Sequence, residues 1–487
     1  MVDLKHQIGR GNPPESGVQM RPKEKQKTHE QPLIGASRFD LMLNMEHELV
    51  RLAEAINWAS LVESFGPLYS EKTGRPGIPI RTMAGLVMLQ HTFGLSDEQV
   101  VGEWPERPYW QFFCGEEFFR HDLPVDGSQL SRWRKRIGEA GVEQLLKLTI
   151  EAGLRTKTVT PKQMQVVVVD TTVQPKAVEF PTDARLFRKV LHHLLRVAEA
   201  TETKLRQSHR DLAKSAFLMH GRYMKAKPPA NGRSRVLLVS FFAEPEPLKR
   251  AARERKKLKV YAGRVQRDLE RKISDEAWEK HKGTLILAGL VLTQEKKTKG
   301  KVYSMHAPEV ECIAKGKAHK PYEFGVKTTL ATTAWGGFAL GARSLPGNPY
   351  DGHTLAEQLD QVLKLTGMMP RRCHVDRGYK GHGVDPESCR VIIAGSRKGI
   401  TKAIKKEMKR RSAIEPEIGH QKADGKLGRN WLKGVLGDAQ NAVLCAVGHN
   451  MRKILAHLRR LFALIWAWLT ATLNPLPRIP GALGSVA

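Results

Sequence analysis

The stretch that most constrains the fold is MQVVVVD, at residues 164–170. Four consecutive valines show no polar alternation, and such a run is typical of a strand that is buried on both faces of a sheet. Asp170 closes the run, and residues 173–178 offer a second short strand beside it. We therefore expect a sheet with this strand in its interior and a carboxylate at the strand's end.

Further strands are expected only after a long interruption. Residues 181–290 have a helical pattern rich in Lys and Arg, and a helix is also expected at 353–366. Apolar runs predict strands at the following places: 302–305, 322–330, 337–343, 372–375 and 390–395. This order predicts an α/β domain whose sheet is split by a helical insertion.

The chain before the sheet is helical in pattern from about residue 39 to residue 150. Gly94 is expected to end one helix, and Ser96 with Gln99 forms a capping box for the next. Two short helices joined by a tight glycine turn are compatible with a helix-turn-helix, but any αα-hairpin gives the same pattern. Residues 1–38 are polar and aperiodic, which predicts a flexible tail.

A basic helix is expected at 128–141, with Ser128 as its N-cap. Around Trp133 it carries four cations: Arg132, Arg134, Lys135 and Arg136. A cluster of this kind is either an ordinary solvated helix face or a helix that contacts DNA phosphates and bases. The pattern alone leaves both interpretations open.

The net charge narrows the class of partner. The 487 residues contain 80 Lys and Arg against 50 Asp and Glu, which gives a net charge of +30. Such an excess indicates a polyanionic partner, first of all nucleic acid, and the alternative is a ribosome-associated or merely basic protein. A lysine- and arginine-rich helix expected at 248–272 contributes to this excess.

Cysteine usage and hydropathy bear on the compartment. The five cysteines form no C-x2-C pair, which argues against a disulfide framework and against a zinc ribbon. The first residues contain no apolar signal segment. The longest apolar stretch, 461–473, is shorter than the ~20 residues that a membrane helix requires. We expect a cytoplasmic, nucleoid-associated protein with no membrane partner.

Two aspartates, Asp170 and Asp376, end predicted strands. Reactive groups in open α/β sheets collect beyond the carboxyl ends of the strands. Either residue alone is also typical of a turn or a helix N-cap. Two such acids in so basic a chain make a shared site the more interesting hypothesis.

A third acidic position lies in KRRSAIEPEIGHQK, at residues 409–422. On a helical wheel Glu415 shares one face with Arg411 and Lys422, and Arg429 continues that face, whereas Glu417 lies on the other side. An ordinary alternative remains, because Ser412-x-x-Glu415 also fits a capping box and the following proline belongs near a helix start.

Three carboxylates with basic neighbours suit phosphodiester chemistry. Two-metal-ion catalysis uses carboxylates to hold two Mg²⁺ ions roughly 3.5–4 Å apart. One ion activates a water or a 3′-OH, and the other stabilises the leaving oxygen. Carboxylate oxygens suit Mg²⁺ or Mn²⁺ better than zinc.

These residues resemble the DDE triad of bacterial insertion-sequence transposases. The resemblance rests on DTTVQPKA around Asp170, on DRGYKG around Asp376 and on IEPEIGHQKADGKLGRN around Glu415. It extends over about residues 39–465, and it includes the signature Tyr-x2-Arg-x3-Glu-x6-Lys. Arg411, Glu415 and Lys422 match that signature, but Met408 stands where the family has tyrosine.

The resemblance implies an RNase H-like mixed sheet that binds two Mg²⁺ or Mn²⁺ ions. It implies that Asp170 bridges both ions, that Asp376 binds one and that Glu415 binds the other. Arg411, Lys422 and Arg429 are then expected to hold DNA phosphates. The activity implied is binding of terminal inverted repeats, cleavage to a 3′-OH and joining of that end to target DNA. A homodimer on paired ends is expected.

On this interpretation the chain has five parts, which are a flexible tail (1–38), an N-terminal helical DNA-binding domain (39–150), a catalytic domain (151–180 with 301–437), a basic helical insertion (181–300) and a C-terminal helix and tail (438–487). Two alternatives stay open: an RNase H-like nuclease that cuts without joining, and an inactive DNA-binding protein descended from a transposase. Tyr379, Thr171 and His353 are weaker candidates for neighbours of the metal ligands.

Overall fold

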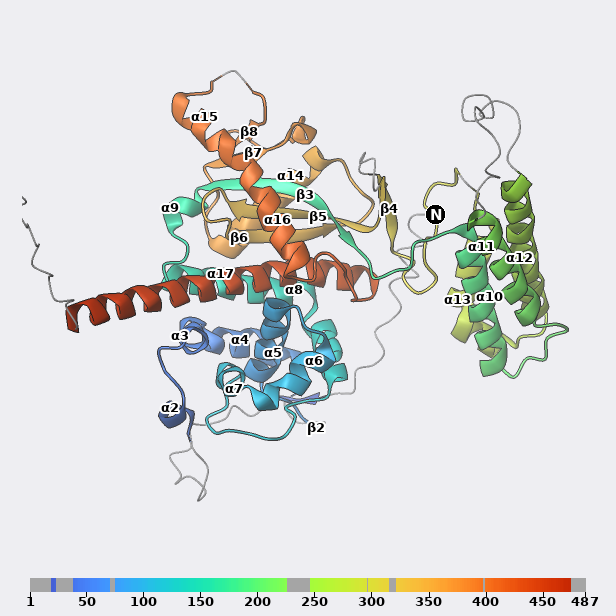
Figure 1. The fold of residues 1–487 in the computed structure, drawn as a ribbon, viewed down its shortest axis with the longest axis horizontal. Helices are drawn as coiled ribbons and strands as arrows, with labels where there is room; N and C mark the ends of the chain where they lie inside the picture. The colour runs from blue at the N-terminus through green and yellow to red at the C-terminus, as the bar shows by residue number, and fades with distance from the viewer. Residues whose placement is uncertain are drawn as a thin grey trace, which may run out of the picture.

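The computed structural model describes residues 19–22, 38–70, 75–225, 246–295, 297–314, 321–396 and 399–473, without the side chains of 75–76 and 464–473 (Figure 1). Most of the tail expected at residues 1–38 lies outside the described residues. Its described part includes the short strand β1 (Gln19–Met20), which pairs in parallel with β2 (Arg75–Pro76).

The α-helices described before the main sheet are α2 (Phe39–Met42), α3 (Glu48–Ala55), α4 (Trp58–Phe65), α5 (Ile80–Phe93), α6 (Asp97–Glu103), α7 (Pro108–Phe113), α8 (Gly127–Arg155) and α9 (Pro161–Met164). Two short 3-10 helices, η1 (Gly66–Leu68) and η2 (Trp104–Glu106), lie among them. The predicted turn between α5 and α6 is confirmed. Gly94 caps α5 with a left-handed backbone (φ 70°), which glycine adopts without strain. Ser96 and Gln99 form the capping box of α6.

The N-cap predicted for the basic helix is wrong. Asp126 is the N-cap of α8, because its carboxylate accepts a hydrogen bond from the Ser128 N–H at 2.9 Å. The helix then runs on to Arg155, with a break in its helical backbone at Gly138 (φ 65°). It is therefore longer than the expected 128–141, and its second half packs in the core.

A six-stranded mixed sheet follows, made of β3 (Val166–Pro175), β4 (Glu311–Ala314), β5 (Tyr322–Thr333), β6 (Ala339–Leu345), β7 (Arg372–Val375) and β8 (Arg390–Ile393). The order is β4-β5-β3-β7-β8, and β6 pairs with β5. β3, β7 and β8 are parallel, whereas β5 is antiparallel to β3, β4 and β6. Residues 302–305 form no strand, contrary to expectation.

β3 runs through Asp170 and continues to Pro175 as one strand. The strand end predicted at Asp170 and the separate strand predicted at 173–178 are therefore wrong. β3 pairs with β5 from Val167 to Pro175, but its pairing with β7 stops at Val168. Beyond Val168, β3 pairs with β5 but no longer with β7. It therefore remains a strand past Asp170, with the edge that faced β7 unpaired with that strand.

The four valines of β3 are buried, as predicted, and they serve two faces of the sheet. Val167 and Val169 belong to the large apolar core that the sheet shares with the N-terminal helices. Val166 and Val168 face the other side, where they meet Ile414. This division follows from the two-residue period of a strand.

The helical segment between β3 and β4 has a core of its own. Its helices are α10 (Asp183–Ala200), α11 (Arg210–Lys225), α12 (Glu246–Glu270) and α13 (Asp275–Thr293). Their buried side chains form an apolar cluster separate from that of the sheet. In Figure 1 this bundle stands to the side of the sheet, beyond β4.

The last part of the chain joins the two halves of the main body. It contains α14 (Asp351–Thr366), η3 (Arg377–Tyr379), α15 (Lys402–Met408), η4 (Lys409–Ala413), α16 (Ile414–Ala423) and α17 (Gly434–Leu473). In Figure 1 α17 passes between the sheet and the N-terminal helices. It contacts α8, α5 and β6, so helices and sheet share one core around it.

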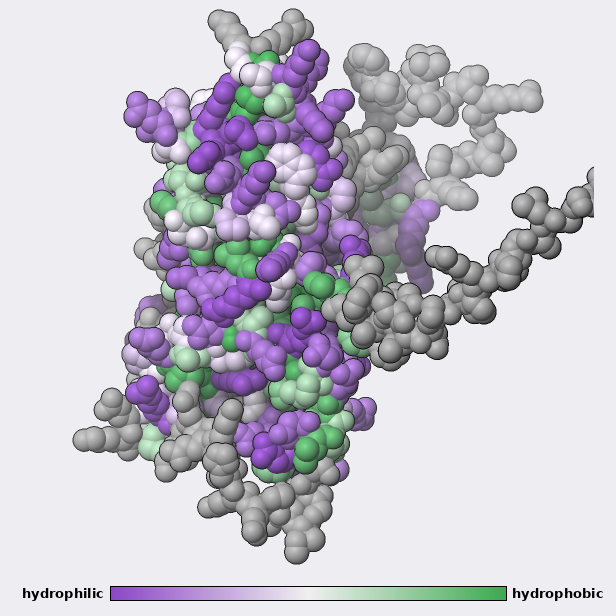
Figure 2. Space-filling view, turned by 90° about the vertical axis from the view of Figure 1, so that its left-hand side faces the viewer, coloured by the Kyte–Doolittle hydropathy of each residue, from purple (hydrophilic) through white to green (hydrophobic). Residues whose placement is uncertain are grey.

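Hydropathy on the described surface is mixed. The face shown in Figure 2 is covered mainly by hydrophilic residues, with hydrophobic patches between them. Among the helices that the structure describes, none combines the length and the apolar character needed to cross a membrane.

Candidate active site

Asp170 and Asp376 lie side by side. In the parallel pair β3–β7, Val166 is opposite Arg372 and Val168 is opposite His374. Extending this register by two residues places Asp170 opposite Asp376, and neighbouring strands are only ~4.8 Å apart. Both carboxylates thus lie where β7 leaves β3, at the point where the sheet opens.

A third aspartate, Asp351, completes this group. It is the first residue of α14, and its Oδ1 accepts a hydrogen bond from the Thr171 hydroxyl at 3.2 Å and another from Lys327 Nζ at 3.0 Å. A Cβ on Gly378 would lie 3.0 Å from Asp376 Oδ1 and 3.2 Å from Asp351 Oδ2. Glycine at 378 therefore leaves room for both carboxylates. We call Asp170, Asp351 and Asp376 the aspartate edge.

Sequence reasoning missed Asp351. In GNPYDGHTL it follows Tyr350 at a helix start, where acidic residues are common because they interact well with the helix dipole. The only local signal is that α14 begins shortly after a strand. His353, one of the weaker candidates, lies on the exposed side of the same helix start.

The aspartate edge changes the ionisation of its members. The pKa of Asp170 is raised to about 6, first because the carboxyl is buried and then because Asp376 and Asp351 are negatively charged. The Thr171 N–H, 2.8 Å from Asp170 Oδ1, and the charge of Arg411 act in the opposite direction. An ionised Asp170 therefore costs free energy, and a bound cation would lower that cost.

Tyr379 lies beneath this edge, fully buried. Burial, followed by the negative charges of the three aspartates, raises the pKa of its phenol. Its hydroxyl has no hydrogen-bond partner among the described residues. Tyr379 is therefore a neutral polar group close to the three carboxylates, in line with its place among the weaker candidates.

Helix α16 brings Glu415 to the same face of the sheet. Ile414 and Ile418 of α16 cluster with Val166 and Val168, the β3 residues that are in phase with Asp170. The Glu415 side chain itself is 63% exposed. The helix is thus anchored by its apolar residues, and the carboxylate next to Ile414 is left accessible.

Arg411 connects Glu415 with the aspartate edge. Its Nη2 lies 3.5 Å from Glu415 Oε1, which confirms the predicted pairing along one face. Its positive charge also lowers the pKa of Asp170. The capping box considered for Ser412 is absent, because Ser412 donates to the Lys409 carbonyl and its side chain does not cap α16.

Glu417 is not the ordinary surface charge that we expected. Its side chain is only 17% exposed and lies 3.0 Å from Lys453 Nζ and 3.2 Å from His449 Nε2, both on α17. Burial alone would raise its pKa, but the His449 hydrogen bond and the Lys453 charge outweigh this and lower it. The helical wheel separated the two glutamates correctly, yet it could not show that Glu417 fastens α16 to α17.

The expected DNA-contacting residues fall into two groups. Arg132, Lys135 and Arg429 are exposed and Lys422 is half-buried. Arg134 is only 2% exposed, and it forms an ion pair with Asp97 and a hydrogen bond with Gln90. Arg134 must therefore be removed from the DNA-contacting set, because its charge already holds α8 to α5 and α6.

Arg136 also has a partner within the fold. Its guanidinium lies 4.7 Å from the centre of the Tyr69 ring, a cation–π distance. Of the four cations around Trp133, those at 132 and 135 therefore point to solvent, while the other two contribute to packing. Arg132 and Lys135 thus lie on a solvated helix face, whereas Arg134 and Arg136 do not.

The donors at the aspartate edge match hard divalent cations in type, because they are carboxylate oxygens with hydrogen-bonded neighbours. Within the described residues, no group of three His, Cys, Asp or Glu side chains is arranged to hold a metal ion. The aspartate edge thus offers oxygen donors of the type that Mg²⁺ prefers, but the described residues do not arrange them as a ready-made metal site. Glu415 lies outside this group of donors.

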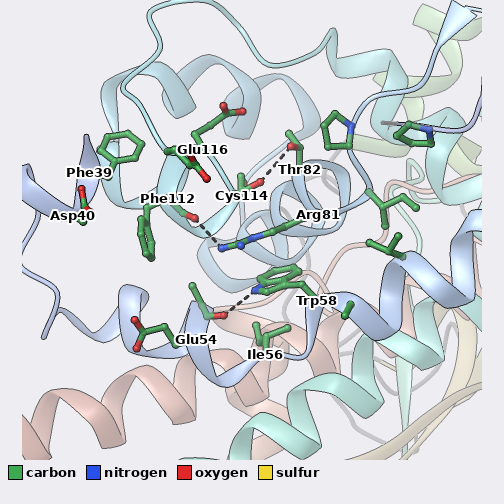
Figure 3. A pocket seen from close by; sticks show the side chains of 18 of the residues that line it. Phe39, Asp40, Glu54, Ile56, Trp58, Arg81, Thr82, Phe112, Cys114 and Glu116 are labelled. Atoms are coloured by element: carbon green, nitrogen blue, oxygen red, sulfur yellow. Dashed lines mark hydrogen bonds between the residues drawn. The ribbon is translucent and has the colours of Figure 1, made fainter. Parts of the chain in front are cut away.

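Two cavities lie near these elements. One, of about 290 Å³, adjoins the aspartate edge; it is lined by His374 and Val375 of β7 and by Met408 and Arg411. Met408, at the signature tyrosine position, is thus a wall residue of this cavity. The other, of about 680 Å³, lies among the N-terminal helices (Figure 3). There the Arg81 guanidinium is bonded to the carbonyls of Phe112 and Phe113.

Comparisons with known proteins agree with a transposase. Residues 37–136 match the family model described as Transposase domain (DUF772). The chain is 50% identical over 190 residues to "Uncharacterized protein ORF8 in nfe locus" of Rhizobium meliloti, which covers 39% of this chain and 91% of that protein. No solved structure matches. The chain belongs to the same family as the Rhizobium protein, and its residues 37–136 match a domain that is described as a transposase domain.

Proposed function

We propose that the chain is a DDE transposase of an insertion sequence. It binds terminal inverted repeats, cleaves DNA to a 3′-OH and joins that end to target DNA. The observation that carries the proposal is that β3 and β7 pair in parallel up to Val168 and His374, two residues before Asp170 and Asp376, and that the charge of Asp376 acts on Asp170. The packing of α16, with Glu415, on the face of β3 to which Asp170 belongs supports it further.

We also propose that the catalytic fold is RNase H-like. Its support is the mixed sheet, in which the antiparallel strands β3, β5 and β6 are followed by the parallel strands β7 and β8. The acidic residues collect where β7 leaves β3, and reactive groups gather at such openings of a sheet.

Each carboxylate has a distinct role in this proposal. Asp170 is on the face of β3 against which α16 packs and is close to Asp376, so it would be the shared ligand of two Mg²⁺ or Mn²⁺ ions, and Asp376 and Glu415 would each hold one. When bound, these ions supply an activated water or 3′-OH and stabilise the leaving oxygen. Arg411, which contacts Glu415 and whose charge acts to lower the pKa of Asp170, meets the DNA phosphate.

The remaining cations are proposed to bind the DNA backbone. Arg132 and Lys135 of α8, Lys422 of α16 and Arg429 lie on elements that pack around the sheet. α12 adds a further row of Lys and Arg. Two copies of the chain on paired ends complete the assembly, because two ends have to be cut and joined together.

A strand-transfer assay tests the proposal. The purified chain is incubated with Mg²⁺, with labelled DNA that carries the sequences flanking its gene and with a separate target plasmid. Products joined to the plasmid are expected. Cleavage without joined products would indicate a nuclease, and binding without cleavage would indicate an inactive DNA-binding protein; either result contradicts the proposal.

A further inference from the structure

The segment after α16 carries an aromatic ring between two cations. Asn430 pairs with Lys176 in an isolated parallel bridge, and exposure alternates around it: Arg429, Trp431 and Lys433 are exposed, Asn430 is buried and Leu432 is half-buried. The Arg429 guanidinium lies over the Trp431 ring, and the exposed Lys433 follows two residues later, so we treat the three exposed side chains as one stripe. We call it the 429–431–433 stripe.

The tryptophan of this stripe is open to solvent. Trp431 is 63% exposed, and the Arg429 guanidinium lies 4.5 Å from the centre of its ring. Single exposed apolar residues are common, but a large aromatic ring stacked with an arginine and followed by a lysine is the kind of surface that binds nucleic acid bases.

A buried polar network holds the stripe in place. Asn430 donates from Nδ2 to Asp438 Oδ1 at 2.6 Å. Lys176 forms ion pairs with Asp438 at 2.8 Å and with Glu309 at 2.7 Å. Glu309 in turn accepts a hydrogen bond from the Gly434 N–H at 2.8 Å. Every member of this network is buried or half-buried, so the exposed side chains stand on a fixed base.

The network also fixes the stripe relative to the aspartate edge. The Asn430 N–H donates to the carbonyl of Pro175, the last residue of β3, at 2.8 Å. Asp170 is five residues earlier on the same strand, which corresponds to ~17 Å at 3.3 Å per residue. This is roughly five nucleotide steps along one DNA strand.

We propose that the 429–431–433 stripe binds unpaired bases of the DNA end, with Trp431 stacking on a base and Arg429 and Lys433 contacting its phosphates. The proposal rests on the proposed function, since it assumes a DNA end at Asp170. Paired bases are stacked inside a duplex, so an exposed ring on a rigid support is of use only where the strands have separated.

Fluorescence anisotropy with two labelled probes tests the stripe. One probe is a blunt duplex, and the other is the same duplex with a single-stranded thymidine extension of about five nucleotides. We expect the full chain to bind the extended probe more tightly. Trp431→Ala should weaken that binding by about tenfold and leave the blunt probe unaffected, because stacking is lost and charge is kept.

Two variants control for structure. Trp431→Phe retains an aromatic face and should keep most of the preference for the extended probe. Trp335→Ala removes another exposed tryptophan, which lies in the β5–β6 turn at the opposite end of β3, and should change neither affinity. Circular dichroism of each variant shows whether the fold is kept.

Several outcomes would contradict the proposal that the stripe binds unpaired bases. If the Trp431→Ala variant binds both probes as tightly as the wild type, Trp431 has no role in DNA binding. If the variant loses the same affinity for both probes, Trp431 does not recognise unpaired bases. If the Trp431→Ala variant differs from the wild type in the sedimentation of the free protein but binds DNA equally well, the stripe serves self-association. The proposed function fails separately, when the wild type shows the extension preference but neither cleaves nor joins DNA.

Discussion

The aspartate edge and helix α16 hold their carboxylates in opposite ways. Asp170 lies in β3 and Asp376 directly follows β7, the neighbouring strand; burial and then the charge of Asp376 raise the pKa of Asp170. Glu415 lies on an exposed helix surface, and its ion pair is with Arg411. The sheet holds the carboxylates of the aspartate edge close together without a ligand. The Glu415 carboxylate is exposed, and only the packing of neighbouring residues of α16 positions it.

This difference indicates how the proposed site is assembled. Burial of the Asp170 carboxylate, and after it the negative charges of Asp376 and Asp351, cost free energy in the folded state. Tyr379, Thr171 and Gly378 are the neighbours of this group. The helix incurs no such cost, because Glu417 secures it to α17 and leaves Glu415 accessible. Removal of a charge should therefore change stability in opposite directions, with a gain at Asp170 and a loss at Glu417.

The largest expected effect is on activity at the aspartate edge. Asp376→Asn keeps the Oδ1 that accepts the Gly378 N–H at 2.8 Å, so the fold should persist. The lost charge should slow DNA cleavage by about 10³-fold, because a carboxylate ligand is worth several kcal/mol to metal-assisted transfer. Single-turnover cleavage measures the rate, and a filter-binding assay should show unchanged DNA affinity. Cleavage near the wild-type rate would remove Asp376 from the site.

The next effect is a gain in stability. Because the pKa of Asp170 is raised to about 6 in the fold, its ionisation lowers the free energy of unfolding as pH rises from about 4 to 6. Asp170→Asn should therefore be more stable than the wild type at pH 7.5 without metal, by up to about 3 kcal/mol. Urea unfolding measures this difference.

Mg²⁺ provides the matched control for that gain. The ion should raise the unfolding midpoint of the wild type more than that of the Asp170→Asn variant, because it relieves the repulsion that the variant lacks. Equal midpoints for the two proteins, with and without Mg²⁺, would show that the aspartate edge carries no electrostatic cost.

A smaller loss of stability is expected at α16. Glu417→Gln removes the charge that pairs with Lys453 and His449 and should lower the free energy of unfolding by ~2 kcal/mol. Glu415→Gln, at an exposed position, should change it by less than ~0.5 kcal/mol. Urea unfolding of both variants measures these changes in the free energy of unfolding. Equal losses would contradict the claim that Glu417 stabilises the fold and Glu415 does not.

The smallest effect is a pH dependence of cleavage. Ionised Asp170 is required, and its pKa of about 6 means that the carboxyl is mostly protonated below that value. Below pH 6, at low Mg²⁺, the cleavage rate should therefore fall about tenfold for each unit of pH. Saturating Mg²⁺ should move the midpoint to lower pH, since the ion favours the charged form. A rate that is flat from pH 5 to 8 at low Mg²⁺ would contradict this.

Local signals predicted much of this structure. The valine run gave a buried strand at β3, and Gly94 with Ser96 and Gln99 gave the turn between α5 and α6, because each depends on a few adjacent residues. The helical wheel paired Glu415 with Arg411 for the same reason.

What could not be predicted depends on partners distant in sequence. Asp351 is part of the site only because α14 meets Thr171 and Lys327, and Arg134 is buried only because Asp97 and Gln90 lie beside it. Likewise Asp170 lies within β3 and not at its end, since β5 continues where β7 turns away. No pattern within a single segment carries this information.

The central claim is that Glu415 of α16 acts together with the aspartate edge. Single-turnover cleavage of the flanking-sequence DNA by wild type, Glu415→Gln and Glu417→Gln, each confirmed as folded, tests it most directly. The account predicts that Glu415→Gln binds DNA normally and cleaves it about 10³-fold more slowly, whereas Glu417→Gln cleaves within about tenfold of the wild type. Wild-type cleavage by Glu415→Gln would contradict the claim.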